Sequence, residues 1–132
     1  MLATCSQFEH GLTLTFEYAP EHDGEPDPGE VVWTWVAYED DPSKGKDRPV
    51  AIVGRWGTRA LAGVALTSKL RPEDADRFPV GTGGWDPDGR PSEAKIDRVL
   101  YVDPTRVRRE GAALERRHFD ALVMAITRRH PE

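Results

Sequence analysis

Apolar and polar residues alternate strictly near the start of the chain. Residues 12–18 carry Leu, Leu, Phe and Tyr at every second position, so these side chains would lie on one face of an extended strand. In residues 30–38 the apolar residues occupy both odd and even positions, and both faces of that strand should meet apolar surroundings. Such a strand is typical of a curled sheet or a barrel.

Three later apolar runs predict further strands, and the end of the chain predicts a helix. The strands are expected at residues 50–54, 63–68 and 94–102. Pro49 is expected at the first position of its strand, where a missing N–H is tolerated. From Ala112 the apolar spacing changes to three and four residues, which predicts a closing helix that stops at Pro131. The pattern is therefore mainly β with one C-terminal helix.

Three connections contain clusters of turn-forming residues. Residues 39–47 are polar and include a Pro and a Gly, so an exposed loop is expected there. Pro72, which two acids follow, predicts a helical turn. Residues 81–91 predict a long, turn-rich connection. The Asp-Pro-Asp-Gly stretch within it, residues 86–89, lacks the spacing of a calcium-binding loop and is interpreted as a turn.

Length and composition limit the number of domains and the cellular compartment. A chain of 132 residues with 38% apolar content can bury one core, whereas two domains would each be marginal. The single Cys5 cannot form an internal disulfide, and the chain opens without a basic or apolar leader, so we expect a cytoplasmic protein. No run approaches the roughly 18 apolar residues of a membrane helix, and no membrane partner is expected.

The negative charge is concentrated at the start of the chain. The net charge is -5, but residues 1–28 hold six acids and no Lys or Arg, which leaves 17 acids against 18 bases in the remainder. We therefore divide the chain into an acidic N-terminal extension with one strand, residues 1–28, and a barrel domain, residues 29–132.

Five segments in order resemble the core of the PemK/MazF toxins. They are Gly-Glu-Val-Val-Trp at residues 29–33, a polar loop, Asp-Arg-Pro-Val at residues 47–50, Val-Ala-Leu-Thr-Ser at residues 64–68, and a late strand at residues 94–103 that leads to a helix. The resemblance covers about residues 29–126. The chain departs from it in the loop, where Ser-Lys-Gly-Lys replaces a common Glu-Gln, and at Arg98, where a Gln is common.

The resemblance implies a fold, an activity and partners. The fold would be an SH3-like barrel, and the protein a homodimeric endoribonuclease, a hydrolase that cuts single-stranded RNA at short motifs with no cofactor and no metal. A cognate antitoxin would hold this toxin inactive. Arg48 and Thr67 would occupy the catalytic positions. The expected RNA-binding residues are Lys44, Lys46, Ser68, Lys69 and Arg98.

The side chains of these two residues are chemically suited to the cleavage of RNA. Attack of the 2'-hydroxyl on phosphorus builds negative charge on the phosphoryl oxygens, which the guanidinium of Arg48 would stabilise. Thr67 would position the reacting groups, since its hydroxyl is too weak an acid to serve as a base. The base stays open among Asp47, Glu39 and the substrate itself.

Several alternatives remain beside this interpretation. Arg48 and Thr67 also fit an ordinary solvated arginine and an ordinary strand residue. The rival function is a catalytically silent barrel that binds a protein partner. The acidic extension is interpreted as a solubilising linker, or as a competitor for an RNA groove. The four histidines lack an acid or Cys at ligand spacing, so no two-histidine ribonuclease or metal site is expected. Of Trp33 and Trp35, at least one is expected in the core.

Overall fold

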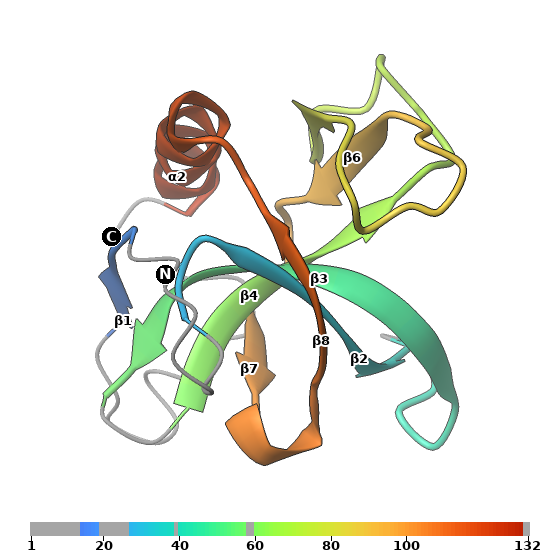
Figure 1. The fold of residues 1–132 in the computed structure, drawn as a ribbon, viewed down its shortest axis with the longest axis vertical. Helices are drawn as coiled ribbons and strands as arrows, with labels where there is room; N and C mark the ends of the chain where they lie inside the picture. The colour runs from blue at the N-terminus through green and yellow to red at the C-terminus, as the bar shows by residue number, and fades with distance from the viewer. Residues whose placement is uncertain (1–13, 19–26, 39, 58–59, 131–132) are drawn as a thin grey trace.

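The computed structural model describes residues 14–18, 27–38, 40–57 and 60–130. It contains short and long strands followed by one helix (Figure 1). The elements, in chain order, are β1 (Leu14–Phe16), β2 (Glu30–Ala37), β3 (Gly45–Trp56), β4 (Ala60–Thr67), β5 (Arg77–Gly81), β6 (Ser92–Lys95), β7 (Leu100–Val102), the short 3-10 helix η1 (Pro104–Arg106), β8 (Arg108–Ala113) and α2 (Arg116–Arg129).

The strands form one strongly curved antiparallel sheet. Its order is β5-β6-β4-β3-β2-β8, with β1 beside β3 and β7 beside β4. The expected mainly β fold with a C-terminal helix is confirmed, and the coiled sheet is consistent with an SH3-like arrangement. Within the described chain, β5 and β8 remain at opposite ends of the strand order, so hydrogen bonding does not close the sheet into a barrel.

Both faces of the central strands are buried, and Val31 and Val32 of β2 enter opposite clusters, in agreement with this part of the pattern in residues 30–38. Along β3, Ala51 and Val53 enter one apolar cluster, which includes Phe119 and other α2 residues. Val50 and Ile52, on the opposite face, enter a second cluster with side chains of β2, β4 and β7. The sheet is therefore the middle layer between two cores, and this fixes which side chains β3 and β4 present at their ends.

The two tryptophans of β2 correct an expectation, because neither lies in the core. Trp33 is half-buried and Trp35 is 56% exposed. The last pair between β2 and β8 is Trp33 with Arg108, so Trp35 lies beyond the end of the neighbouring strand. A strand residue without neighbours to cover it stays in solvent, whatever its hydrophobicity.

The strand expected at residues 50–54 begins earlier than predicted. β3 starts at Gly45, which pairs with Ala37 of β2, so the polar loop is shorter than residues 39–47. Pro49 is inside β3 and pairs with Trp33. Pairing with β4 begins only at Val50, so Pro49 lies where β3 has a neighbour on one side, a position that tolerates a missing N–H. The mostly polar residues from Gly45 to Asp47 were therefore predicted as part of a loop, but they belong to the exposed end of the β2–β3 hairpin.

Other boundaries differ because they depend on pairing. The predicted late strand is two strands, β6 and β7, separated by a turn at residues 96–97 through which the apolar pattern continues. β5 and β8 carry no clear alternation and were not predicted. The closing helix begins at Arg116, since Ala112 belongs to β8 and pairs with Val31. The helical turn predicted at Pro72 is instead two successive turns, closed at the amides of Asp74 and Arg77.

The described part of the N-terminal segment is bound to the sheet. β1 pairs with residues 54–56 of β3, in agreement with the strand expected at residues 12–18. Tyr18 packs against Phe119 of α2, with 4.9 Å between ring centroids, and donates a hydrogen bond of 2.8 Å to the Leu114 carbonyl. Most of residues 1–28 lie outside the described residues, and the division into an extension and a domain remains a prediction.

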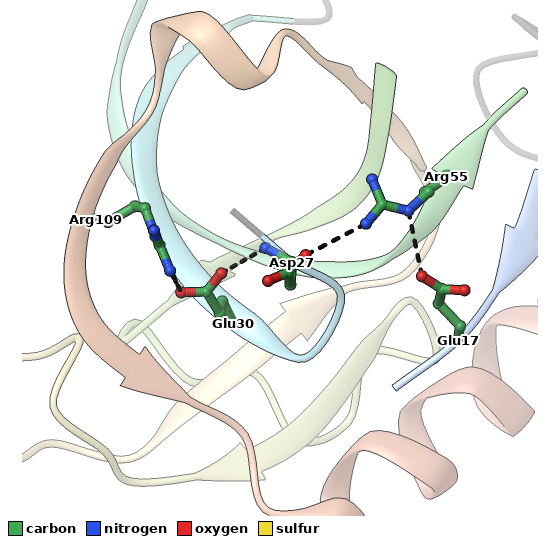
Figure 2. A network of polar contacts seen from close by, with 5 residues as sticks. All are labelled: Glu17, Asp27, Glu30, Arg55 and Arg109. Carbon is green, nitrogen blue, oxygen red and sulfur yellow. Dashed lines mark hydrogen bonds and ion pairs between the residues drawn. The ribbon is translucent and has the colours of Figure 1, made fainter. Parts of the chain in front are cut away.

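Five charged side chains tie this segment to the sheet (Figure 2). The Arg55 guanidinium contacts Glu17 at 3.2 Å and Asp27 at 3.4 Å. The Glu30 carboxylate accepts a hydrogen bond from the Asp27 amide and one of 2.6 Å from Arg109. Arg55 lies seven residues along β3 from Arg48, which is roughly 20 Å in an extended strand. The described acids of the N-terminal segment therefore pair at the end of β3 remote from Arg48.

Candidate functional site

β3 and β4 bring Arg48 and Thr67 to the same region of the sheet. Val50 of β3 pairs with Ala65 of β4. Arg48 lies two residues before Val50, and Thr67 lies two residues after Ala65. Because the strands are antiparallel, these two steps run in the same direction from the Val50–Ala65 pair, so Arg48 and Thr67 lie near each other. Two-residue steps also keep the side chains on the same face. Residues 19 positions apart in the chain therefore line one pocket.

This pocket, which we call the phosphate pocket, has a volume of about 280 Å³. Its walls come from β2, the start of β3, the end of β4, the turn after β4 and the connection between β5 and β6. The charged residues that line it are Lys46, Asp47, Arg48, Lys69, Arg71, Arg77, Asp86, Arg90 and Lys95. Seven cations against two acids make this wall positive, although the chain as a whole carries a net charge of -5.

The guanidinium of Arg48 has no partner among the described residues. The side chain is half-buried, and it makes no hydrogen bond or ion pair with the described part of the chain. Its charge is permanent, and all five of its N–H donors are directed by a rigid plane. Because none of the described carboxylates forms an ion pair with this half-buried cation, it is suited to an external anion.

The hydroxyl of Thr67 is oriented by the turn that follows β4. Its Oγ1 accepts a hydrogen bond of 3.1 Å from the amide of Lys69. An oxygen that accepts in this way still has its own hydrogen to donate. Thr67 is therefore held as a donor beside the cationic wall, and Ser68 and Lys69 of the same turn also line the phosphate pocket.

A buried carboxylate holds the segment after Thr67 in place. Glu93 of β6 is 4% exposed and accepts a hydrogen bond of 2.8 Å from the amide of Arg71. Arg77 lies 3.7 Å from the same carboxylate and donates a hydrogen bond of 2.9 Å to the Lys69 carbonyl. No sequence pattern marks Glu93 or Arg77, because their contacts depend on the pairing of β6 with β4 and β5.

The connection between β5 and β6 forms the opposite wall. Trp85 is buried and donates a hydrogen bond of 3.0 Å to the Ser92 hydroxyl. Asp86 accepts from the Asp88 amide at 2.9 Å and from the Arg90 guanidinium at 3.0 Å. The Asp88 amide, with the further help of Arg90, holds the pKa of Asp86 below its ordinary value. Asp86 therefore stays ionised near neutral pH and is unsuited to proton transfer.

The predicted RNA-binding residues are distributed unevenly. Lys46, Ser68 and Lys69 line the phosphate pocket together with the two predicted catalytic residues. Arg98 lines a second pocket, which shares Arg48 and Lys95 with the first. Lys44 lines none of these pockets. The sequence carries no motif that marks Lys95, Arg71 or Arg90 for this site.

Of the carboxylates considered as a base, only Asp47 is seen at the pocket. It lines the phosphate pocket and forms an exposed ion pair of 3.1 Å with Arg108. Glu39 lies outside the described residues. Asp47 is therefore the candidate acceptor of a proton in this region.

The described chain offers no cluster of three or more His, Cys, Asp and Glu residues that would hold a metal ion. The ring of His130 is buried and its Nε2 lies 2.6 Å from the Ile96 carbonyl. His118 lies on α2 near Gly81. His10 and His22 are outside the described residues.

None of the described helices is both long and apolar enough to cross a membrane.

Comparison with known proteins gives one finding about the whole site region. A family model described as PemK-like, MazF-like toxin of type II toxin-antitoxin system matches residues 27–129. That range includes the phosphate pocket and all residues predicted to act in it. A comparison with curated proteins finds no match.

Proposed function

Since the chain belongs to the PemK-like, MazF-like toxins of type II toxin-antitoxin systems, we propose that it is an endoribonuclease that cuts single-stranded RNA in the phosphate pocket. Membership in a type II toxin family implies a protein antitoxin as a partner. The observation that carries the proposal is the guanidinium of Arg48, which has no partner among the described residues and lines the same cationic pocket as Thr67.

The proposed reaction uses the protein, the RNA and solvent water. The 2'-hydroxyl oxygen attacks phosphorus, the bond to the 5'-oxygen breaks, and the products are a 2',3'-cyclic phosphate and a 5'-hydroxyl. Arg48 faces the charge that develops on the phosphoryl oxygens. Thr67 donates its hydroxyl hydrogen to one of these oxygens. Asp47 takes the proton of the 2'-hydroxyl, and a proton from water neutralises the leaving oxygen.

Binding of the RNA strand is assigned to the other cations of the pocket. The side chains of Lys46, Lys69 and Lys95 make no ion pair with the described residues, so no protein carboxylate has to be displaced when a phosphate enters. Such contacts attract and position a nucleic acid backbone without reading its sequence. We further propose a homodimer that acts in the cytoplasm, where the RNA substrate and the antitoxin would be found.

The decisive experiment is incubation of the purified protein with a long, unstructured RNA in EDTA. Discrete fragments that end in a cyclic phosphate are expected, and the Arg48→Ala variant should leave the RNA intact. Sedimentation of the same protein samples tests whether the protein is a dimer. Intact RNA with the wild-type protein at micromolar concentration would refute the nuclease.

One observation favours the rival function, a catalytically silent barrel that binds a protein. Trp35 and Tyr101 are 56% and 48% exposed and line the same groove beside β2 and β7. Exposed aromatic rings on a groove are common where proteins associate. Intact RNA combined with a stable complex that depends on Trp35 would support this alternative.

A further inference from the structure

A second pocket lies against the phosphate pocket. Its volume is about 250 Å³, and Arg48 and Lys95 belong to the walls of both pockets. Because the two pockets share these residues, a group bound in one is adjacent to a group bound in the other. We call the second one the base pocket, for the reason that follows.

The two pockets differ in the chemistry of their walls. The phosphate pocket carries seven cations, whereas the base pocket combines the buried apolar residues Val36, Ala65 and Leu100 with three cations and one carboxylate. A phosphate requires donors and positive charge, and a nucleobase is a flat, largely apolar ring with a polar edge. The pair of pockets therefore matches the two parts of one nucleotide.

Arg98 is the polar group that is fixed most firmly at the base pocket. Its Nη1 donates a hydrogen bond of 2.7 Å to the Ala37 carbonyl, and the side chain is half-buried. This is its one hydrogen bond to the described residues, so the guanidinium is oriented while most of its donors remain for a ligand. Arg98 follows the turn between β6 and β7 and lines the base pocket together with Val36 and Ala37 of β2.

The arrangement of donors and acceptors selects among the bases. Arg98 and Lys95 can only donate, whereas the Asp40 carboxylate, which also lines the pocket, can only accept. Guanine offers two adjacent acceptors, O6 and N7, which suit an arginine fork, and its N1–H and N2–H groups suit a carboxylate. Cytosine and adenine present an amino group where guanine presents O6, so they would face Arg98 with a donor. Uracil presents the acceptor O4 but has no N7, so it offers the arginine fork one acceptor instead of two.

From these observations we infer that the base pocket receives a guanine next to the cleaved phosphate, and that Arg98 selects it. The inference rests on the proposed ribonuclease function and adds a substrate preference to it. Arg48, at the boundary, would then contact the phosphate of the nucleotide whose base lies against Leu100.

Binding of single nucleotides tests the pocket without any turnover. Guanosine 5'-monophosphate and cytidine 5'-monophosphate are titrated into the full chain, and the amide signals of Ala37 and Leu100 are followed by NMR. Guanosine monophosphate should shift both signals and bind more tightly than the cytidine nucleotide, by about tenfold, the lower part of the range for a bidentate contact. Equal affinities, or shifts that avoid both residues, would overturn the inference.

Cleavage of RNA tests the preference itself. The cut sites of the wild-type protein on a long RNA should be enriched in guanine on one side of the cut. Arg98→Lys keeps the charge and removes the fork, so it should reduce this enrichment about tenfold while cleavage continues. Lys95→Gln provides a second variant if Arg98→Lys folds poorly by circular dichroism. Arg117→Gln is the matched control, because Arg117 is an exposed residue of α2 that lines neither pocket.

The outcomes separate the two proposals. Cleavage that shows no base preference, or a preference that Arg98→Lys leaves unchanged, refutes the base pocket and retains the nuclease. Guanosine binding at Ala37 and Leu100 without any cleavage by the wild-type protein refutes the nuclease and retains the pocket.

Discussion

At the scale of single residues, Arg48 combines a permanent charge with a half-buried position that lacks a carboxylate partner among the described residues. Arg48→Ala should lower the rate of RNA cleavage by about 100-fold or more, because one donor aimed at developing charge contributes on that order. Arg48→Lys should recover part of the loss, since it restores the charge without the paired donors. The measurement is the single-turnover rate at saturating enzyme. Arg117→Ala, which removes an exposed arginine of α2, should leave the rate unchanged. A wild-type rate in Arg48→Ala would contradict the assigned role.

Substitutions of Thr67 test whether cleavage needs a hydroxyl at the end of β4 or only a side chain that fits a strand. Thr67→Val keeps the shape and removes both the donor and the acceptor of the Lys69 amide, and it should slow cleavage by at least about tenfold. Thr67→Ser retains the hydroxyl and should stay near the wild-type rate. If valine and serine behave alike in the same single-turnover assay, Thr67 has no chemical role.

The lowered pKa of Asp86 predicts how the stability of the folded protein depends on pH. Its carboxyl has a pKa held below the ordinary value of 3.8, first by the Asp88 amide and then by Arg90. The folded protein therefore favours the ionised form, and this stabilisation is complete above about pH 3.8 and is lost as the pH falls through the lowered pKa. Asp86→Asn should have a lower Tm than the wild type at pH 7, and the difference should shrink below pH 3.8. Thermal unfolding followed by circular dichroism checks this, with Asp88→Asn as the exposed control. A constant difference across pH would argue against the charge.

At the scale of elements, the segment after β1 fastens the closing helix to the sheet. The Tyr18 hydroxyl donates to the Leu114 carbonyl, which comes just before α2, and the Tyr18 ring packs on Phe119 of that helix. Both β1 and Tyr18 precede the range of the family match, residues 27–129. This chain therefore uses residues in addition to the family core to hold α2.

Removal of the Tyr18 hydroxyl should measure this attachment. Tyr18→Phe should reduce the free energy of unfolding by about 1 kcal/mol, the usual net value of one hydrogen bond. Urea unfolding is the appropriate measurement. Tyr101→Phe is the matched control, because Tyr101 is 48% exposed and its hydroxyl makes no hydrogen bond with the described chain. Equal losses in the two variants would indicate that the bond to Leu114 does not contribute.

At the scale of the whole molecule, charge is separated along β3. The described acids of the N-terminal segment pair with Arg55 at one end, and the cationic pocket occupies the other. Net charge therefore gives a poor indication of what this protein binds, because a ligand responds to the local field and salt screens charges farther than about 10 Å away.

This separation predicts a strong dependence of RNA binding on salt. Lys46, Arg48, Lys69 and Lys95 line the phosphate pocket without an ion pair to the described residues. At about 0.7 per phosphate contact for a single strand, four contacts should give a slope near -3 in a plot of log affinity against log salt. Fluorescence anisotropy with a non-cleavable 2'-deoxy oligonucleotide measures the slope. Lys69→Gln should reduce its magnitude by about 0.7. A slope near zero would exclude the pocket as the binding surface.

The amino-acid sequence by itself determined the fold class and the family, and it predicted Arg48 and Thr67 as the central residues of the site. Apolar residues at both odd and even positions of residues 30–38 predicted burial on both faces, and the order of short segments around Arg48 and Thr67 pointed to the family that the match to residues 27–129 confirms. These features are local, since a two-residue period or a short motif is complete within one stretch of chain.

Only the tertiary structure decided which residues surround that centre. Lys95, Glu93 and Asp86 reach the site through the pairing of β6 with β4 and β5, and Arg98 reaches it through a turn that interrupts an apolar run. The sequences of β5 and β8 show no clear alternation of apolar and polar residues. These segments form strands because a neighbouring strand supplies their hydrogen bonds. Such contacts join residues far apart in the chain, so their energies depend on strand register, which no single segment encodes.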